Sequence, residues 1–459
     1  MRKVLFISLG CDKNLADSEE MLGMLVENGY TLTNDETEAE IIVVNTCAFI
    51  HDAKEESINS ILEMARYKTE GVLKVLLVTG CLAQRYKEEI IKEIPEVDAV
   101  LGTTSFGDII KALDKVFEGE RYLEFKDINA LTEISKKRVL TTGGYYGYLK
   151  IAEGCDKRCT YCIIPKLRGN YRSIPMEQLI SQAEYLAEQG VRELILVAQE
   201  TTVYGKDIYQ EKCLHKLLKE LCKIPGIQWI RILYCYPEEI YPELIQTMKE
   251  EKKICHYLDL PIQHCSDKIL KKMGRRTTKQ ELIDIVTLLR KEIPDIVLRT
   301  TLITGFPGET EEDHEELMEF IDTMEFDRLG VFTYSAEEDT PAANMPNQIE
   351  EEVKQDRQAE LMELQQEISI DKGNDKIGTC VEVMIEGKVA DENAYVGRTY
   401  GDAPNVDGYI FINTDTELMS GDFARVHVTG ALEYDLIGDR KSTRLNSSHS
   451  SISRMPSSA

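Results

Sequence analysis

The sequence predicts an α/β protein built from three domains. These are an N-terminal Rossmann-like parallel α/β domain, a central partial (βα)6 barrel and a small C-terminal five-stranded β-barrel. Buried strand patterns alternate with amphipathic helix patterns as far as about residue 335. After residue 375 the pattern changes to short strands separated by turns. The chain of 459 residues is also longer than one hydrophobic core normally serves.

The overall composition predicts a soluble cytoplasmic protein rather than a membrane or secreted one. No stretch approaches the roughly 18 apolar residues of a membrane span, and the start "MRKVLFISLG" resembles a strand more than a signal peptide. In a cytosolic chain, 12 cysteines indicate metal binding or catalysis more often than disulfides. The net charge of −27 repels phosphate backbones and suits a basic protein partner, although acidity that serves only solubility explains it about as well.

Residues 1–135 form the predicted N-terminal domain. Its strand patterns "KVLFIS", "IIVVN" and "KVLLVT" each lead into a cysteine, namely Cys11, Cys47 and Cys81. Helices are expected at "SEEMLGMLVENGY", "KEESINSILEMARY" and "QRYKEEIIKEI". Because open α/β sheets bind ligands beyond the carboxyl ends of their strands, the three cysteines are expected to converge. The alternative is three separate buried thiols.

Residues 141–372 form the predicted central domain with its connecting helix, and residues 375–438 form the predicted β-barrel. Six strand patterns with helices between them, such as Met176–Gly190, predict a complete or partial barrel whose site lies at the carboxyl ends of its strands. The strand patterns are "YGYLKIA", "ELILVAQ", "WIRILY", "YLDLPI", "VLRTTLI" and "RLGVFTYS". The serine-rich stretch 441–459 has no acidic residue and is expected to be a non-native tail, which replaces the natural end near Asp439.

Three cysteines, Cys155, Cys159 and Cys162, lie within eight positions after the first strand of the central domain. Such a loop can hold a structural zinc ion or an iron–sulfur cluster. Zinc normally requires a fourth Cys or His nearby, and the loop contains none. A 4Fe–4S cluster on three cysteines leaves one iron open to chelate a substrate or cofactor.

The Cx3Cx2C spacing, with Tyr161 before the last cysteine, resembles the signature of the radical S-adenosylmethionine (SAM) superfamily. The resemblance implies that the amino and carboxylate groups of SAM chelate the open iron. It also implies that an electron from the cluster cleaves SAM to a 5′-deoxyadenosyl radical. Cys155, Cys159 and Cys162 would then be the catalytic cluster ligands.

Taken together, the three predicted domains resemble the radical-SAM methylthiotransferase family over residues 1–438. This resemblance implies a second 4Fe–4S cluster on Cys11, Cys47 and Cys81, whose open iron carries the sulfur that is methylated and transferred. Two SAM molecules would be used per turnover, one as methyl donor and one as radical source. The C-terminal barrel would be a TRAM domain.

Several stretches resemble the branch that modifies the β-carbon of an aspartate in ribosomal protein S twelve: "SLGCDKNLADSE", "NTCAFI", "TGCLAQRY", "LKIAEGCDKRCTYCIIP", "HYLDLPIQH", "GVFTYSAEEDTPAA" and "GRTYGDAPNVDG". The alternatives are a transfer-RNA methylthiotransferase acting on a modified adenosine next to the anticodon, and a non-catalytic iron–sulfur or zinc module. Residues 375–440 hold 13 acidic and five basic side chains. An RNA-binding barrel should carry a positive stripe, so a basic ribosomal protein is the expected partner and transfer RNA is not. An electron donor and a sulfur donor are also expected.

The sequence also contains six candidate SAM contacts: Tyr161, Gln199, Glu200, Arg299, Gly305 and Gly308. Gln199 and Glu200 follow the second strand of the barrel, but solvated loop residues are an equal alternative. Arg299 lies inside a strand and needs a partner, either the SAM carboxylate or a buried acid. Gly305 and Gly308 belong to "TGFPGET", which near SAM would allow close backbone approach and otherwise is an ordinary Gly-Pro turn.

The remaining candidates are two pairs of residues that lie close in the sequence and five isolated cysteines. Arg168 and Arg172 flank the cysteine loop and are expected either to pair with the cluster or to cap the surface. His264 and Cys265 are read as a turn residue and a packed thiol rather than as pocket lining. The remaining cysteines share no spacing and are expected to bind no metal: Cys213, Cys222, Cys235, Cys255 and Cys380.

Overall fold

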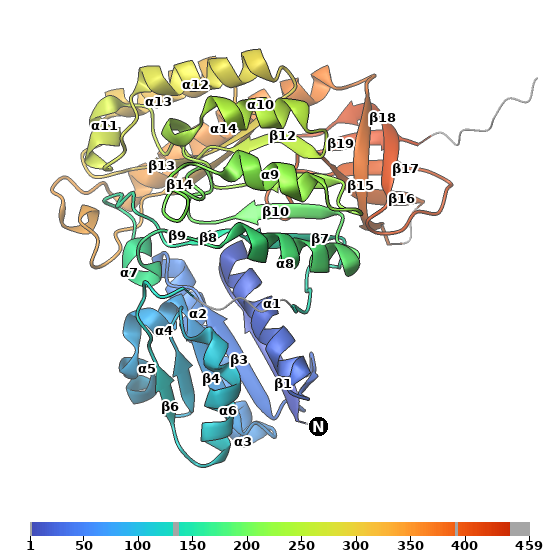
Figure 1. The fold of residues 1–459 in the computed structure, drawn as a ribbon. Helices are drawn as coiled ribbons and strands as arrows, with labels where there is room; N and C mark the ends of the chain where they lie inside the picture. The colour runs from blue at the N-terminus through green and yellow to red at the C-terminus, as the bar shows by residue number, and fades with distance from the viewer. Residues whose placement is uncertain (1, 132–136, 391–392, 441–459) are drawn as a thin grey trace, which may run out of the picture. The chain divides into compact units, whose positions relative to one another are not determined.

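The computed structural model describes residues 2–131, 137–390 and 393–440. The chain divides into two compact units, Met1–Lys372 and Gly373–Ala459 (Figure 1). The first unit holds two parallel sheets and the second a closed β-barrel. The expected tail at 441–459 lies outside the described residues.

The first sheet of unit one has six parallel strands in the order β2-β1-β3-β4-β5-β6. The strands are β1 (Lys3–Ser8), β2 (Thr31–Leu32), β3 (Ile41–Thr46), β4 (Val75–Gly80), β5 (Ala99–Leu101) and β6 (Tyr122–Glu124). Every residue of β3 and β4 is buried, because helices cover both faces of the sheet (Figure 1). The predicted Rossmann-like domain is confirmed.

Alternate side chains of β3 enter different cores. The helices on the two faces of this sheet are α1 (Asp12–Glu27), α2 (His51–Ala65), α3 (Tyr67–Glu70), α4 (Cys81–Tyr86), α5 (Glu88–Glu93) and α6 (Ile109–Phe117). Ile41 and Val43 pack with α1 and α6, whereas Ile42 and Val44 pack with α2, α4 and α5. The single helix expected over "QRYKEEIIKEI" is wrong: Lys87, at φ +47°, separates α4 from α5.

The second sheet of unit one is an open parallel sheet in the order β14-β13-β12-β11-β10-β7 (Figure 1). Its strands are β7 (Tyr146–Lys150), β10 (Glu193–Val197), β11 (Trp229–Ile232), β12 (Ile254–Asp259), β13 (Val297–Thr304) and β14 (Arg328–Thr333). Helices between the strands bury their apolar faces against it: α8 (Met176–Glu188), α9 (Leu214–Cys222), α10 (Pro242–Glu250), α11 (Asp267–Lys272), α12 (Lys279–Glu292) and α13 (Glu311–Met324). The predicted partial (βα)6 barrel is confirmed.

The second unit is a closed five-stranded barrel, as predicted. Its strands are β15 (Cys380–Lys388), β16 (Ala394–Thr399), β17 (Ile410–Asn413), β18 (Phe423–Ala431) and β19 (Leu436–Asp439). Alternate residues such as Val383, Ile385 and Val426 fill its interior. Helix α14 (Glu351–Asp375) precedes the barrel. Within the described residues, no helix has the length and apolar character needed to cross a membrane.

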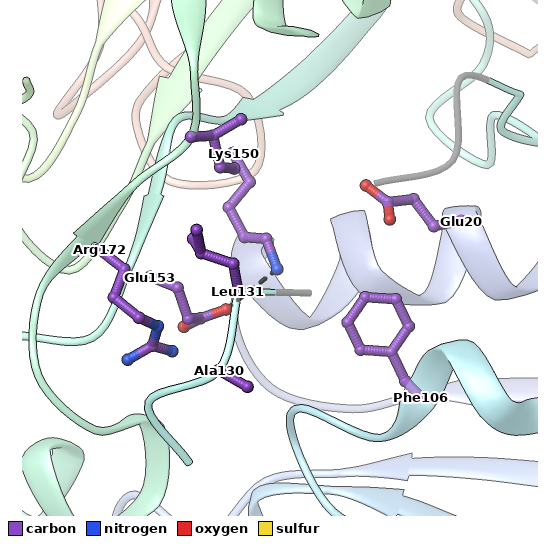
Figure 2. A pocket seen from close by; sticks show the side chains of 8 residues that line it. Glu20, Phe106, Ala130, Leu131, Lys150, Glu153 and Arg172 are labelled. Carbon is purple, nitrogen blue, oxygen red and sulfur yellow. Dashed lines mark hydrogen bonds and ion pairs between the residues drawn. The ribbon is translucent and has the colours of Figure 1, made fainter. Parts of the chain in front are cut away.

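Helix α1 links the two sheets of unit one, because its acidic side chains face the partial (βα)6 barrel. Glu19 accepts a hydrogen bond of 2.5 Å from Arg138, and both side chains are fully buried. Glu20 accepts a bond of 3.3 Å from Gln182 of α8, and its Oε2 has no hydrogen-bond partner among the described residues. Figure 2 shows Glu20 across a small pocket from Lys150 and Glu153. Burial raises the pKa of Glu20 to about 7, although Lys150 and Arg138 oppose that shift.

This raised pKa predicts that the Glu20→Gln variant is more stable than the parent above about pH 7. The folded parent holds a proton on Glu20 that the unfolded chain releases near 4.5, so its stability falls as pH rises from 4.5 through about 7. Glu20→Gln does not undergo this loss. Its free energy of unfolding should therefore exceed that of the parent by about 1–3 kcal/mol at about pH 8 and equal it near pH 4.5. Urea unfolding at both pH values measures the difference. The exposed Glu55→Gln is the control, and an equal effect of both variants would contradict the assignment.

Candidate functional site

Cys11, Cys47 and Cys81 follow three neighbouring strands of the first sheet. Strand β1 pairs with β3 and β3 pairs with β4, so the cysteines after them lie at one edge of the sheet. Burial raises the pKa of the Cys47 thiol to about 12, and the nearby Cys81 and Cys11 add to that shift. The structure therefore brings these three thiols together, as the strand-end pattern predicts.

Glycines with positive φ precede two of these cysteines, Gly10 at +88° before Cys11 and Gly80 at +92° before Cys81. A Cβ on Gly10 would lie 2.8 Å from the Cβ of Cys47, so the turn after β1 passes directly against Cys47. Both turns place a cysteine at a helix start: Cys11 is the N-cap of α1 and Cys81 opens α4. Sequence reasoning missed this signal, a glycine before the cysteine in "SLGC" and "TGC".

Asn14 of α1 fixes the loops that carry Cys11 and Cys47. Its amide donates to the carbonyls of Leu9 and Thr46, both at 3.0 Å. Asn45 donates back to the carbonyl of Asn14 at 2.9 Å. These buried bonds hold the strand ends in register, and they explain part of the "SLGCDKNLADSE" motif.

Cys155, Cys159 and Cys162 lie in a loop closed at its base by two short antiparallel strands, β8 (Ala152–Glu153) and β9 (Arg172–Ser173). The backbone N–H of Cys155 donates to the carbonyl of Gly169, and that of Cys162 donates to the carbonyl of Cys159. Burial raises the pKa of Cys155 to about 11, and Cys159 contributes. Burial also raises the pKa of Cys162, with contributions from the other two thiols. The loop therefore folds its three sulfurs toward one another.

Neither cysteine group has the arrangement of a single-ion site. Among the described residues, no three or more His, Cys, Asp or Glu side chains are positioned to hold one metal ion. A zinc ion needs its ligands around one point. In a four-iron cluster each thiolate binds a different iron, so the sulfurs lie further apart. Two sets of three grouped thiols, of which only Cys11 is exposed, suit clusters in which each thiolate binds a different iron.

Arg168 belongs to α7 (Ile164–Arg168), directly after Cys162, yet it faces the other cysteine group. Its guanidinium donates to Asp17 at 2.8 Å and to Glu153 at 3.1 Å, and it also bonds to the side chain of Asn14. Cys81 is its strongest electrostatic neighbour after the effect of burial, so the guanidinium lies close to the Cys81 thiol, which raises the pKa of Arg168. The alternative that Arg168 caps the surface is wrong, because the side chain is 2% exposed and lies between α1 and the cysteine loop.

Arg172 holds the base of the same loop. It donates to the carbonyls of Asn170 at 2.5 Å and of Arg168 at 3.1 Å. Its role in the structure is thus to close the loop on itself.

Gln199 and Glu200 lie just after β10 and carry unused polar atoms. Gln199 donates to Glu153 at 2.9 Å, while its Oε1 has no partner among the described residues. Glu200 is 1% exposed, and its Oε2 also has none there. Burial raises the pKa of Glu200 to about 7. Buried polar atoms without partners are rare, so these two suit an absent polar ligand.

Tyr161, Tyr236 and Arg275 surround Cys159, and sequence reasoning missed the last two. The hydroxyl of Tyr236 lies 4.0 Å from the sulfur of Cys159. The guanidinium of Arg275 lies 4.3 Å from the Tyr236 ring centre. Arg275 is 7% exposed, and its Nε and Nη1 have no hydrogen-bond partner among the described residues. A buried cation with free donors suits an anionic ligand such as an iron–sulfur cluster.

Arg299, Gly305 and Gly308 have partners within the chain. Arg299 donates to Asp259 at 2.9 Å, which is the buried-acid alternative for this residue. A Cβ on Gly305 or Gly308 would each lie 2.2 Å from a lysine side chain, Lys354 and Lys272 respectively. Both glycines have positive φ, so the turn geometry and these close contacts account for them.

His264 and Cys265 are fully buried. His264 Nδ1 accepts bonds of 3.0 Å from the backbone N–H groups of Cys265 and Ser266, and burial lowers its pKa to about 3. The pair therefore forms a neutral, packed turn. The five remaining cysteines are scattered over other parts of the fold: Cys213, Cys222, Cys235, Cys255 and Cys380.

Comparison with known proteins agrees with this arrangement. Three family models match the chain: Uncharacterized protein family UPF0004 at residues 3–102, the Radical SAM superfamily at 149–321 and the TRAM domain at 377–440. A protein of Lachnoclostridium phytofermentans named ribosomal protein uS12 methylthiotransferase RimO is 66% identical over 95% of this chain and 99% of its own length. The chain belongs to the RimO family. A RimO protein of Clostridioides difficile is 50% identical over 96% of this chain and 99% of its own.

Solved structures show the same fold at lower identity. The radical SAM methyltransferase TsrM from Kitasatospora setae matches with a TM-score of 0.54 and 14% identity over 85% of this chain and 79% of its own. OxsB, a cobalamin-dependent SAM radical enzyme, matches with a TM-score of 0.52 and 14% identity over 79% of this chain and 56% of its own. The predicted family and enzyme class are thus confirmed for a RimO-type radical-SAM methylthiotransferase.

Gly154, which precedes Cys155, provides a test of the loop geometry. A Cβ there would lie 2.1 Å from the carbonyl oxygen of Asn170, and φ is +79°. Gly154→Ala should lose about 2–4 kcal/mol of stability and most of the iron bound by this loop. The control is Gly226→Ala, with φ +89° but nothing within 4 Å of its Cβ, which should lose only about 1–2 kcal/mol. Unfolding curves and iron content measure both, and equal losses would contradict the steric argument.

Proposed function

We propose that this chain methylthiolates the β-carbon of an aspartate in ribosomal protein uS12, with two SAM molecules used per turnover. One observation carries the proposal. Arg168, from the loop of Cys155, Cys159 and Cys162, is buried beside Cys81 of the second cysteine group. A chain that uses both cysteine groups in one reaction needs such a junction. The relative that is 66% identical to this chain is named a uS12 methylthiotransferase.

Two 4Fe–4S clusters fit the two groups of thiols. The radical-SAM cluster would be held by Cys155, Cys159 and Cys162. The auxiliary cluster would be held by Cys11, Cys47 and Cys81. When bound, the first supplies the electron that cleaves SAM and the second carries the sulfur to be transferred. The buried cations Arg168 and Arg275 would offset the negative charge of the thiolates.

The residues of the chain itself would orient SAM. Glu200 Oε2 and Gln199 Oε1 are buried acceptors with no hydrogen-bond partner among the described residues, and each can accept a hydrogen bond from the SAM amino group or ribose. Lys157 lies 4.0 Å from Glu200 and also contacts Glu239 at 2.5 Å, and its charge opposes the burial that raises the pKa of Glu200. Tyr161 packs edge-on against Phe306 and would shield the cysteine loop from water.

Transfer RNA is the less favoured substrate. Only five basic side chains occur over residues 375–440, against 13 acidic ones. One of the five, Arg398, is fully buried and bonded to Glu386 and to the carbonyl of Asp402. A barrel of this charge suits a basic ribosomal protein better than a phosphate backbone. The non-catalytic module is likewise less favoured, because of the acceptors without partners near Cys155.

The wider setting follows from this chemistry. We assign the auxiliary cluster domain to residues 1–135, the radical SAM core with its connecting helix to 141–372 and the TRAM barrel to 375–438. A ribosomal substrate places the enzyme in the cytoplasm. Turnover also requires an electron donor for the cluster and a sulfur donor to replace the transferred sulfur.

Reconstitution of the full chain tests this function. Anaerobically purified protein should contain about eight irons, and with SAM, reductant and sulfide it should add one methylthio group to the uS12 aspartate. Cys159→Ala should keep about four irons and form no 5′-deoxyadenosine. Cys47→Ala should also keep about four irons, but still form 5′-deoxyadenosine without methylthiolated peptide. Peptide mass spectrometry provides the readout, and one zinc with no iron, or modification of transfer RNA alone, would overturn the proposal.

Glu200 provides a separate test of SAM binding. Glu200→Gln removes the charge and half of the acceptor capacity, so the affinity for SAM should fall about tenfold while iron content stays constant. The shift that SAM causes in the electron paramagnetic resonance signal of the reduced cluster reports binding. The exposed Glu211→Gln is the control. Unchanged SAM affinity would remove Glu200 from the site.

A further inference from the structure

The segment that follows β14, residues 335–342, contacts elements that carry both cysteine groups. It belongs to the stretch "GVFTYSAEEDTPAA", whose purpose the reaction alone does not explain. Its central residue, Glu337, is 2% exposed although it is a carboxylate in a loop. Buried carboxylates are paired, so its partners show what the loop is for.

Glu337 binds two cations from the first sheet's domain. It accepts a bond of 2.8 Å from Lys54 of α2 and one of 3.2 Å from Arg85 of α4. Arg85 is only 6% exposed, and it also donates to the carbonyl of Ala48 at 3.3 Å. Ala48 directly follows Cys47, and Arg85 lies in the helix that Cys81 opens. One end of the segment is therefore anchored to the loops of the auxiliary cysteines.

The other end is anchored to the radical-SAM cysteine loop. The N–H of Ala342 donates to the carbonyl of Thr160 at 2.9 Å, and Thr160 lies between Cys159 and Cys162. Ala342 is fully buried in an apolar cluster with Phe306 and Tyr334, against which Tyr161 packs. Between the two anchors the chain makes a tight turn, in which Thr340 donates to the carbonyl of Glu337 through both its N–H, at 3.2 Å, and its hydroxyl, at 2.6 Å.

We propose that Glu337 is a positioning residue that fixes the spacing between the two cysteine groups. This inference rests on the proposed function, in which sulfur held by one group must reach a substrate radical formed at the other. Short, largely buried ion pairs at one end and a backbone bond at the other leave the segment little freedom. A change of about 1 Å between reacting centres can cost a hundredfold in rate without touching either centre.

Glu337→Gln tests the proposal because it keeps the shape and removes the charge. Lys54 and Arg85 then lose their common buried partner, and the junction should loosen while each cysteine group keeps its own contacts. We expect unchanged iron content and SAM cleavage, with at least tenfold more 5′-deoxyadenosine formed per methylthiolated peptide. The magnetic interaction between the two reduced clusters in the paramagnetic resonance spectrum should also weaken, because it decreases steeply with distance.

Glu338→Gln is the matched control. Glu338 neighbours Glu337 and contacts Arg85 at 3.2 Å and Tyr86 at 2.5 Å, but it is 57% exposed. Its loss should change neither the product ratio nor the magnetic interaction, because exposed pairs contribute little. Glu337→Asp, which keeps the charge on a shorter side chain, should fall between the parent and Glu337→Gln.

Two results would overturn the proposal. One is a Glu337→Gln enzyme with the parent's product ratio and magnetic interaction. The other is a parallel loss of iron from both groups in Glu337→Gln and Glu337→Asp, which would make the residue a general stabiliser. A parent enzyme that lacks a second cluster or does not modify uS12 would instead refute the proposed function, and it would show this before any Glu337 variant is compared.

Discussion

The buried ion pair between Arg168 and Asp17 is the contact on which the two cysteine groups jointly depend. Asp17 lies on the helix that begins after Cys11, and Arg168 lies on the helix that follows Cys162. Removing one partner of such a pair costs about 3–5 kcal/mol, because the other charge stays buried. Separation of the Rossmann-like domain from the partial (βα)6 barrel would therefore break this pair and expose the site between them.

The network around this pair balances its charges and extends to Gln199, which follows β10. Glu153 accepts from both Arg168 and Lys150, and these cations outweigh the effect of burial and lower its pKa. Gln199 donates to the same carboxylate. Lys150 also pairs with Asp17. Arg168, Glu153 and Gln199 thus form a continuous hydrogen-bonded connection between α1 and the carboxyl end of β10.

The junction at Glu337 complements the one at Arg168. Arg168 connects the cysteine loop to α1, whereas Glu337 connects the segment after the last barrel strand to α2 and α4. Two attachments at separate places prevent the Rossmann-like domain and the partial barrel from rotating about a single contact. Rigid support of two groups that react together requires this. Within unit one, the barrel and the Rossmann-like domain thereby form a single frame for both cysteine groups.

The sequence by itself determined the fold class and the short motif of Cys155, Cys159 and Cys162, because strand periodicity and close cysteine spacing are local properties, and its motifs carried the resemblance to the family. It also indicated that Cys11, Cys47 and Cys81 converge, since parallel strands end at one edge. Only the tertiary structure decided the partners of Arg168, Arg275 and Glu337. Their roles come from contacts between residues more than a hundred positions apart or from burial, and local pattern carries no record of either. The break at Lys87 was hidden for a related reason, because the positive φ of one residue leaves the helical pattern around it intact.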